Sequence, residues 1–146
     1  MTPAAGRATS ALLLAGWSAL VWWALTSQKV GAEPWFPGSR YVFNVGHGAI
    51  FAVEALLVGW CLRPRERPGT SRAWLAAALV AWAYSAVLEW RQGTIPGRSA
   101  SAVDLVTNAI GAFGAPWALS TSPIRVGRVA LVAGAVLLSA LVDTLL

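Results

Sequence analysis

The sequence has little charge and few reactive side chains. Of its 146 residues only 12% are charged, and it contains one cysteine and one histidine. A single cysteine excludes an internal disulfide, and no CxxC pair or histidine-rich run indicates a structural metal site. The sequence also lacks the GxSxG, HExxH and nucleotide-loop motifs. These absences argue against a familiar serine hydrolase, a zinc protease or an NTPase.

Apolar side chains dominate what is present. Hydrophobic residues make up 57% of the chain and the mean hydropathy is +0.61, which is too apolar for a soluble domain of this length. The net charge of +5 would suggest nucleic-acid binding in a soluble protein. In a membrane protein the distribution of the basic residues matters more than their sum. We therefore expect a single multi-pass domain, residues 1–146, in the cell membrane, with no nucleic-acid partner.

Five apolar segments predict an all-α integral membrane bundle of about five transmembrane helices. The second segment, with about 22 residues, is long enough to cross a hydrocarbon core of about 30 Å. The first segment, with Arg7 before it, also loosely fits a cleavable leader, but we favour a retained span. The segments are residues 11–26, 41–62, 73–90, 103–119 and 124–146.

The basic residues predict the orientation of the bundle. If all five segments cross, seven basic residues lie on the side of the N-terminus and four on the other side. Cytoplasmic loops of membrane proteins carry an excess of Lys and Arg, so the N-terminus is predicted inside and the C-terminus outside. The inner set is Arg7, Arg63, Arg65, Arg67, Arg72, Arg125 and Arg128, and the outer set is Lys29, Arg40, Arg91 and Arg98.

Polar side chains concentrate in residues 88–111, where the third segment ends and the fourth begins. Carboxylates near hydrocarbon are costly and rare, so several polar groups at two adjoining segment ends indicate a functional site. Asp104 and Asn108 are four residues apart and therefore share one helical face. The polar set of this stretch is Glu89, Gln92, Arg98, Asp104 and Asn108.

The second segment carries the only histidine. Four of its residues step by three and four positions, which places them on one stripe of a helix. They are Asn44, His47, Phe51 and Glu54. We expect this stripe to face protein rather than lipid.

The predicted orientation brings polar residues from several segments to the outer end of the bundle. The converging set is His47, Glu89, Arg98 and Asp104. At a rise of 1.5 Å per residue, Glu54 lies about 10 Å deeper than His47. Asn108 lies about 6 Å below Asp104 by the same rise. We expect a polar pocket that opens outward and has Glu54 and Asn108 as its floor.

At these residues the chain resembles the VanZ-like membrane protein family, known for a member that confers low-level teicoplanin resistance. The match covers about half of the chain, and His47 is similar to the histidine of the family's second span. An Asp-Lys pair often precedes that histidine where this chain has Phe43 and Asn44, and Glu54 occupies a usually apolar place. The resemblance implies a helical integral membrane protein of the cell envelope. Its most specific part is the pattern E-x2-Q-x3-P-x-R-x5-D-x3-N-x2-G, matched by Glu89, Gln92, Pro96, Arg98, Asp104, Asn108 and Gly111.

Structural interpretations of the same residues remain open. Asp104 fits a capping box with Ser101 and can simply satisfy the start of a helix. Glu89 and Arg98 can form a buried ion pair across the turn. Gly111 can serve helix packing, as can Asn108. Asp143, near the chain end, is interpreted as an exposed terminal charge.

Two functions follow from this interpretation. In the first, the pocket binds a membrane lipid headgroup or a lipid-linked cell-wall precursor and gives glycopeptide resistance. In the second, an intramembrane enzyme acts on a lipid-linked substrate by acid–base chemistry. A divalent cation on Glu89, Asp104 and Glu54 is compatible with either, but no ligand spacing argues for it, and no cofactor is assigned. The candidate catalytic residues are Glu89, Asp104 and His47, and the candidate binding residues are Arg98, Gln92, Asn108, Glu54 and Asn44.

Overall fold

The chain folds into five helices. The computed structural model describes residues 3–27, 38–62, 71–119 and 125–145, and every structural statement below refers to these ranges. The all-α prediction is confirmed, and each helix covers one of the predicted apolar segments. The helices are α1 (Pro3–Thr26), α2 (Ser39–Leu62), α3 (Ser71–Gln92), α4 (Ala102–Leu119) and α5 (Arg125–Leu145).

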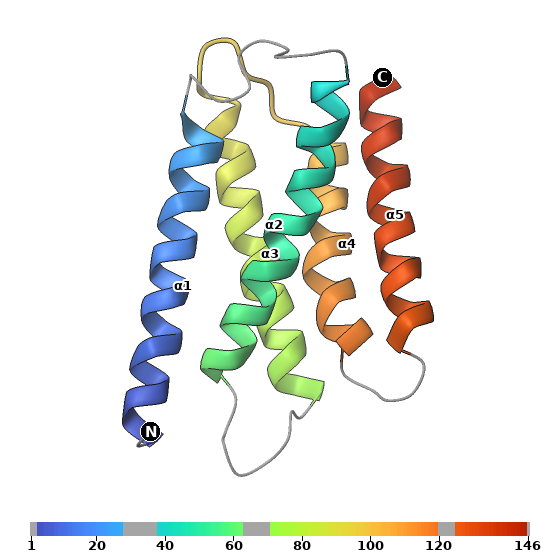
Figure 1. Ribbon diagram of the computed structural model, residues 1–146. Helices are drawn as coiled ribbons and strands as arrows, with labels where there is room; N and C mark the ends of the chain where they lie inside the picture. Colours follow the sequence, from blue (N-terminus) through green and yellow to red (C-terminus); the bar gives the residue numbers. More distant parts are fainter. Residues whose placement is uncertain (1–2, 28–37, 63–70, 120–124, 146) are drawn as a thin grey trace.

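The helices form an up-and-down bundle in which successive helices run in opposite directions (Figure 1). α2 packs against all four other helices, α4 packs against α2, α3 and α5, and α1 packs against α2 and α3. The two termini lie at opposite ends of the bundle (Figure 1). The ends of α1, α3 and α5 therefore meet the starts of α2 and α4 at one end, which we call the polar end.

Four of the helices are long and apolar enough to cross a membrane. They are the stretches Ala8–Thr26, Tyr41–Leu62, Arg72–Gln92 and Gly127–Leu145. α4 has 18 residues and carries Asp104 in its first turn. It packs beside the four spans as part of the same bundle. The predicted N-in orientation stays a prediction, and Arg63, Arg65 and Arg67 of the inner basic set lie outside the described residues.

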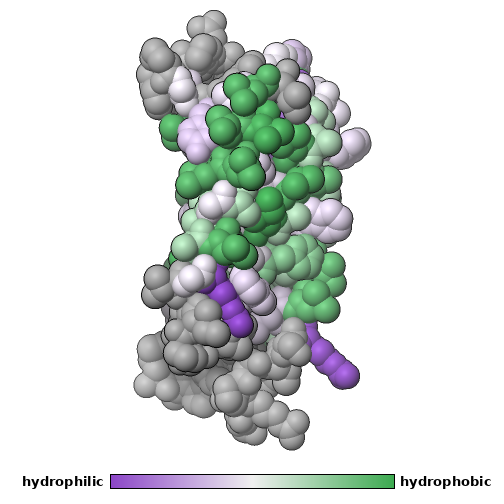
Figure 2. All heavy atoms as spheres, turned by 90° about the vertical axis from the view of Figure 1, so that its right-hand side faces the viewer, coloured by the Kyte–Doolittle hydropathy of each residue, from purple (hydrophilic) through white to green (hydrophobic). Residues whose placement is uncertain are grey.

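The outer surface of the bundle is apolar. Leu12, Leu131 and Leu138 are each more than 60% exposed, which would be unfavourable in water and suits a hydrocarbon surrounding. Figure 2 shows this hydrophobic surface on one face of the molecule, with hydrophilic side chains toward the lower end. The helices therefore present the exterior expected of a membrane protein.

The backbones of α2 and α4 come into direct contact at two glycines. A Cβ atom at Gly111 would overlap the carbonyl oxygen of Gly48, so only glycine permits this approach. Small residues let membrane helices pack this closely. The expected packing role of Gly111 is thereby confirmed. Because His47 precedes Gly48, the contact also fixes the position of His47 relative to α4.

Candidate functional site

A tight turn connects α3 to α4 and positions Arg98. The backbone N–H of Arg98 donates to the carbonyl oxygen of Ile95 at 3.1 Å, and Gly97 has a φ of 81°. Pro96 followed by a glycine of positive φ is typical of a type II β-turn, so the sequence Ile-Pro-Gly-Arg determines the turn locally. The turn directs Arg98 back toward α1.

Arg98 and Gln92 attach this turn to the end of α1. The Arg98 guanidinium donates to the carbonyl oxygens of Leu25, at 2.5 Å, and Ser27, at 3.3 Å. The Gln92 amide donates to the same Leu25 oxygen at 2.9 Å. The last carbonyls of a helix have no partner within the helix and carry partial negative charge, so they attract a cation.

This arrangement differs from the predicted ion pair between Glu89 and Arg98. In the described part of the chain, the hydrogen bonds of Arg98 go to α1 rather than to a carboxylate. Burial lowers the pKa of the Arg98 guanidinium, while the charges of Glu89 and Asp104 oppose this shift. Arginine remains protonated under such shifts because the ordinary pKa of its guanidinium lies far above neutral pH. Arg98 therefore acts on the acids through space.

The first turn of α4 is capped by two different side chains. Ser101 is the N-cap, since its hydroxyl accepts the backbone N–H of Asp104 at 3.2 Å. In a complete capping box the Asp104 carboxylate would accept the backbone N–H of Ser101 in return. Here a Glu89 carboxylate oxygen from α3 accepts that N–H at 2.5 Å. The Asp104 carboxylate is thus released from the capping role that its spacing allows.

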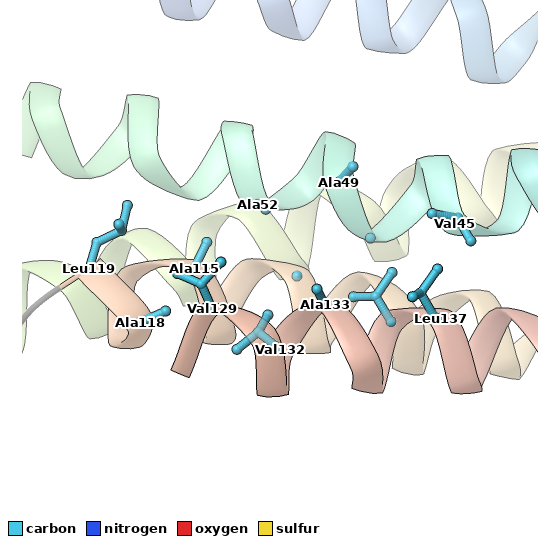
Figure 3. A pocket seen from close by; sticks show the side chains of 13 residues that line it. Val45, Ala49, Ala52, Ala115, Ala118, Leu119, Val129, Val132, Ala133 and Leu137 are labelled. Carbon is cyan, nitrogen blue, oxygen red and sulfur yellow. The ribbon is translucent and has the colours of Figure 1, made fainter. Parts of the chain in front are cut away.

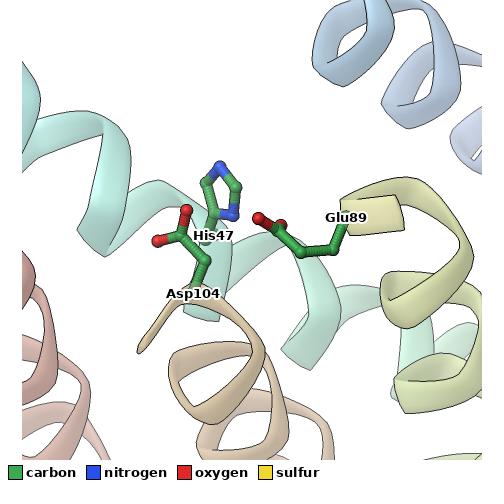
Figure 4. A group of neighbouring side chains, drawn as sticks. All are labelled: His47, Glu89 and Asp104. Atoms are coloured by element: carbon green, nitrogen blue, oxygen red, sulfur yellow. The ribbon is translucent and has the colours of Figure 1, made fainter. Parts of the chain in front are cut away.

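Three of the predicted residues meet at the polar end: His47 from α2, Glu89 from α3 and Asp104 from α4. One potential ligand atom from each residue lies within 4.8 Å of the other two. Figure 4 shows the Asp104 and Glu89 carboxylates on either side of the His47 ring. His47 is 7% exposed and Glu89 is 6% exposed. We call these three residues the acid–histidine cluster.

Two atoms of the cluster are buried without a hydrogen-bond partner among the described residues. They are Nδ1 of His47 and Oδ1 of Asp104. Buried polar atoms are nearly always paired, so an unpaired nitrogen and an unpaired oxygen in one place call for an explanation. Buried atoms of Trp17, Ser39, Glu54 and Asn108 also lack a partner in the described ranges, but the cluster contributes two such atoms from neighbouring side chains.

A cavity of about 730 Å³ adjoins the cluster at the polar end. His47 and Asp104 contribute to its wall together with Arg98, so ionisable side chains of both signs face one space. Leu25, from the end of α1, gives part of the wall an apolar character. The other lining residues are Ala24, Val42, Phe43, Asn44, Gly46, Ile50, Gln92, Gly97, Ser99, Ala100, Ser101, Ala102, Val103 and Asp143.

Asp143 is a further residue of this site, which the sequence did not predict. Its interpretation as an exposed terminal charge is wrong, because Asp143 is half-buried and lines the cavity. Its carboxylate accepts hydrogen bonds from the Asn44 amide at 2.7 Å and from the Ser101 hydroxyl at 2.8 Å. The signal that could have found it is topological. Five alternating helices bring the end of the fifth beside the starts of the second and fourth.

The predicted floor of Glu54 and Asn108 is also wrong, since neither residue lines the cavity. Glu54 accepts a hydrogen bond from the Ser18 hydroxyl of α1 at 2.8 Å. Phe51 lies between His47 and Glu54 on the same stripe of α2 and is fully buried. Asn108 is only 1% exposed and belongs to the core of the bundle.

A second cavity of about 410 Å³ lies between α2, α4 and α5 and has a purely apolar wall (Figure 3). Its lining side chains offer no hydrogen-bonding group, so it provides nothing that would orient a polar ligand. The polar cavity is consequently the better candidate for a functional site. The lining residues are Val45, Gly48, Ala49, Ala52, Gly111, Ala115, Ala118, Leu119, Val129, Val132, Ala133, Val136 and Leu137.

Comparisons of the chain with protein-family models, with curated proteins and with solved structures found no match. The chemistry of the site must therefore be argued from its own residues. A guanidinium that faces a cavity suits a phosphate or a carboxylate. A histidine between two carboxylates suits proton transfer or the binding of a cation.

Proposed function

We propose that this protein binds the polar headgroup of a membrane lipid or of a lipid-linked cell-wall precursor in the cavity at the polar end. The observation that carries the proposal is the cavity itself, which places Arg98, His47 and Asp104 inside a bundle with an apolar exterior. A polar chamber within an apolar bundle suits a ligand that has a charged head and a hydrocarbon tail.

The wall of the cavity matches both parts of such a ligand. Within the described ranges, Arg98 uses one guanidinium nitrogen for the end of α1, and a guanidinium has five N–H donors, so further donors remain there for a phosphate. Val42 and Ile50 of α2 and Leu25 of α1 offer apolar contact for the beginning of a tail. The resemblance to VanZ-like proteins supports a cell-envelope ligand and a role in low-level teicoplanin resistance.

Drug sensitivity tests this proposal. We expect expression in a glycopeptide-sensitive host to reduce sensitivity to teicoplanin more than to vancomycin, because teicoplanin is anchored to the membrane by a lipid. Arg98→Ala should abolish the effect, and Arg98→Lys should restore part of it, since an ammonium keeps the charge but not the planar fork.

Arg91→Ala is the matched control for this experiment. Arg91 lies near Arg98 at the polar end, but it is exposed and donates to the Thr94 hydroxyl outside the cavity. Its removal should leave protection unchanged. If Arg98→Ala protein of equal membrane abundance protects as well as the parent, the cavity is not the source of resistance.

An enzymatic function is the second candidate, and the acid–histidine cluster is the observation that favours it. Glu89 or Asp104 would act as a general base, His47 would relay the proton, and Arg98 would hold the substrate phosphate. Turnover of a lipid-linked precursor by purified protein, lost in Asp104→Asn, would decide for catalysis. Saturable binding without turnover would decide for the binding protein.

A further inference from the structure

We propose that His47, Glu89 and Asp104 form a binding site for a divalent transition-metal cation of the Mn²⁺ or Zn²⁺ type. The inference goes beyond headgroup binding and does not depend on it. Three helices each contribute one potential ligand atom, and these atoms lie within 4.8 Å of one another. Two ligands held at about 2.1 Å from one cation lie roughly 3 to 4 Å apart. Small side-chain rotations therefore suffice to close the site.

The unpaired atoms of the cluster are the second observation. His47 is 7% exposed, and its Nδ1 has no hydrogen-bond partner in the described ranges. Figure 4 shows a ring nitrogen of His47 directed toward the Glu89 carboxylate. Oδ1 of Asp104 is buried and unpaired in the same way. A cation bound between them would give both atoms the partner that buried polar groups normally have.

The charge of the polar end also calls for a cation. Among the described residues, Glu89, Asp104 and Asp143 are three carboxylates, and Arg98 is the guanidinium whose charge reaches Glu89 and Asp104. With a neutral histidine and all three carboxylates ionised, these described groups carry a formal excess of two negative charges. A buried excess of this size is unfavourable near hydrocarbon, and one divalent cation would balance it.

The three ligands, one imidazole and two carboxylates, favour a particular class of metal. Mg²⁺ and Ca²⁺ prefer oxygen ligands, whereas an imidazole together with two carboxylates suits Mn²⁺, Fe²⁺ or Zn²⁺. The Ser101 backbone N–H holds one oxygen of Glu89 in place, as outer partners of metal ligands commonly do. Three protein ligands leave coordination positions open, and His47 and Asp104 border the cavity. The open coordination positions of the cation would therefore face the cavity in which we propose that the headgroup binds.

The decisive experiment uses the untagged full chain in detergent, stripped of metal with a chelator and titrated with Mn²⁺ or Zn²⁺. We expect one Mn²⁺ per chain by electron paramagnetic resonance, displaced by Zn²⁺. His47 is the only histidine in the chain, so coupling of Mn²⁺ to one imidazole nitrogen in pulsed spectra would identify the ligand. Because no lipid-linked precursor is present, this result is independent of the headgroup proposal.

Variants then assign the remaining ligands. His47→Gln, Glu89→Gln and Asp104→Asn should each weaken metal binding at least about tenfold. Glu54→Gln is the matched control, because Glu54 is an equally buried glutamate outside the cluster, and it should bind like the parent. The proposal is overturned if the parent binds neither metal, if bound Mn²⁺ shows no nitrogen coupling, or if all variants bind equally. The nitrogen coupling of bound Mn²⁺ is measured on the parent protein, so the proposal is tested even if a variant fails to fold.

Discussion

The interface between α2 and α4 contains two regions of opposite character. Toward the polar end of this interface, His47 and Asp104 hold buried polar atoms without partners in the described structure. Gly48, directly after His47, and Gly111, about two turns beyond Asp104, bring the two backbones into contact with no side chain between them. The two regions therefore differ in their roles. The glycine contact holds α2 and α4 rigidly together, and this rigid packing keeps His47 and Asp104 in positions where they neither pair with each other nor move apart.

The largest effect should come from breaking the glycine contact. Gly111→Ala places a Cβ on the Gly48 carbonyl oxygen, so α2 and α4 must separate. We expect a loss of about 3 kcal/mol in the free energy of unfolding, at the upper end for overpacking. Unfolding in mixed micelles measures it. The control is Gly134→Ala, where a Cβ meets nothing within 4 Å, and an equal loss in both variants would contradict the prediction.

Ser101→Ala should have the next largest effect. It removes the cap of α4 and the hydrogen bond that the hydroxyl donates to Asp143. We expect a loss of about 1–2 kcal/mol in the free energy of unfolding, as for other N-cap serines. The same unfolding measurement applies. Ser99→Ala, at an exposed position of the same turn, should lie within about 0.5 kcal/mol of the parent. If Ser101→Ala has the same free energy of unfolding as the parent, then Glu89 alone caps the helix.

Asp104→Asn should change the free energy of unfolding by less than about 1 kcal/mol in metal-free protein. Its carboxylate has a buried oxygen without a partner in the described ranges, and the change removes one of several neighbouring negative charges. The same variant should nevertheless lose metal binding. A loss of stability as large as that of Ser101→Ala would mean that Asp104 is structural and would remove the contrast between the two regions.

The next prediction concerns the orientation of the bundle in the membrane rather than its stability. In a Cys61→Ser background, Ser99→Cys should be labelled by an impermeant thiol reagent from outside the cell, because the positive-inside bias places the polar end there. A cysteine at Arg65 should be labelled only from the cytoplasm. The reverse pattern would place the cavity on the cytoplasmic side and remove the link to extracellular glycopeptides.

Local spacing predicted the helices and their buried faces well. The stripe of Asn44, His47, Phe51 and Glu54 is buried as expected, because residues three and four apart share a helical face. The turn before Arg98 follows from Pro96 and Gly97 by the same local reasoning. Features that depend on neighbouring residues were therefore accessible from the sequence.

Features that depend on contacts between distant segments were not. Spacing could not reveal that Glu54 accepts a hydrogen bond from Ser18 of α1 and lies outside the cavity, since the extent of a cavity depends on the side chains of other helices. Spacing also could not reveal that Arg98 donates hydrogen bonds to carbonyl oxygens at the end of α1, more than 70 residues away in the chain. Asp143 was missed for the same reason, because its partners lie on α2 and before α4.

The bond from the Ser101 backbone to Glu89 has a consequence for how the chain assembles. α4 does not complete its own first turn, because the acceptor for that N–H comes from α3. α3, α4 and the turn between them should therefore enter the bilayer as one hairpin, in which the end of α3 and the start of α4 become ordered together. Amide hydrogen exchange at Ser101 should then report on the α3 terminus, and Glu89→Gln should accelerate exchange in the first turn of α4 before it affects any other helix.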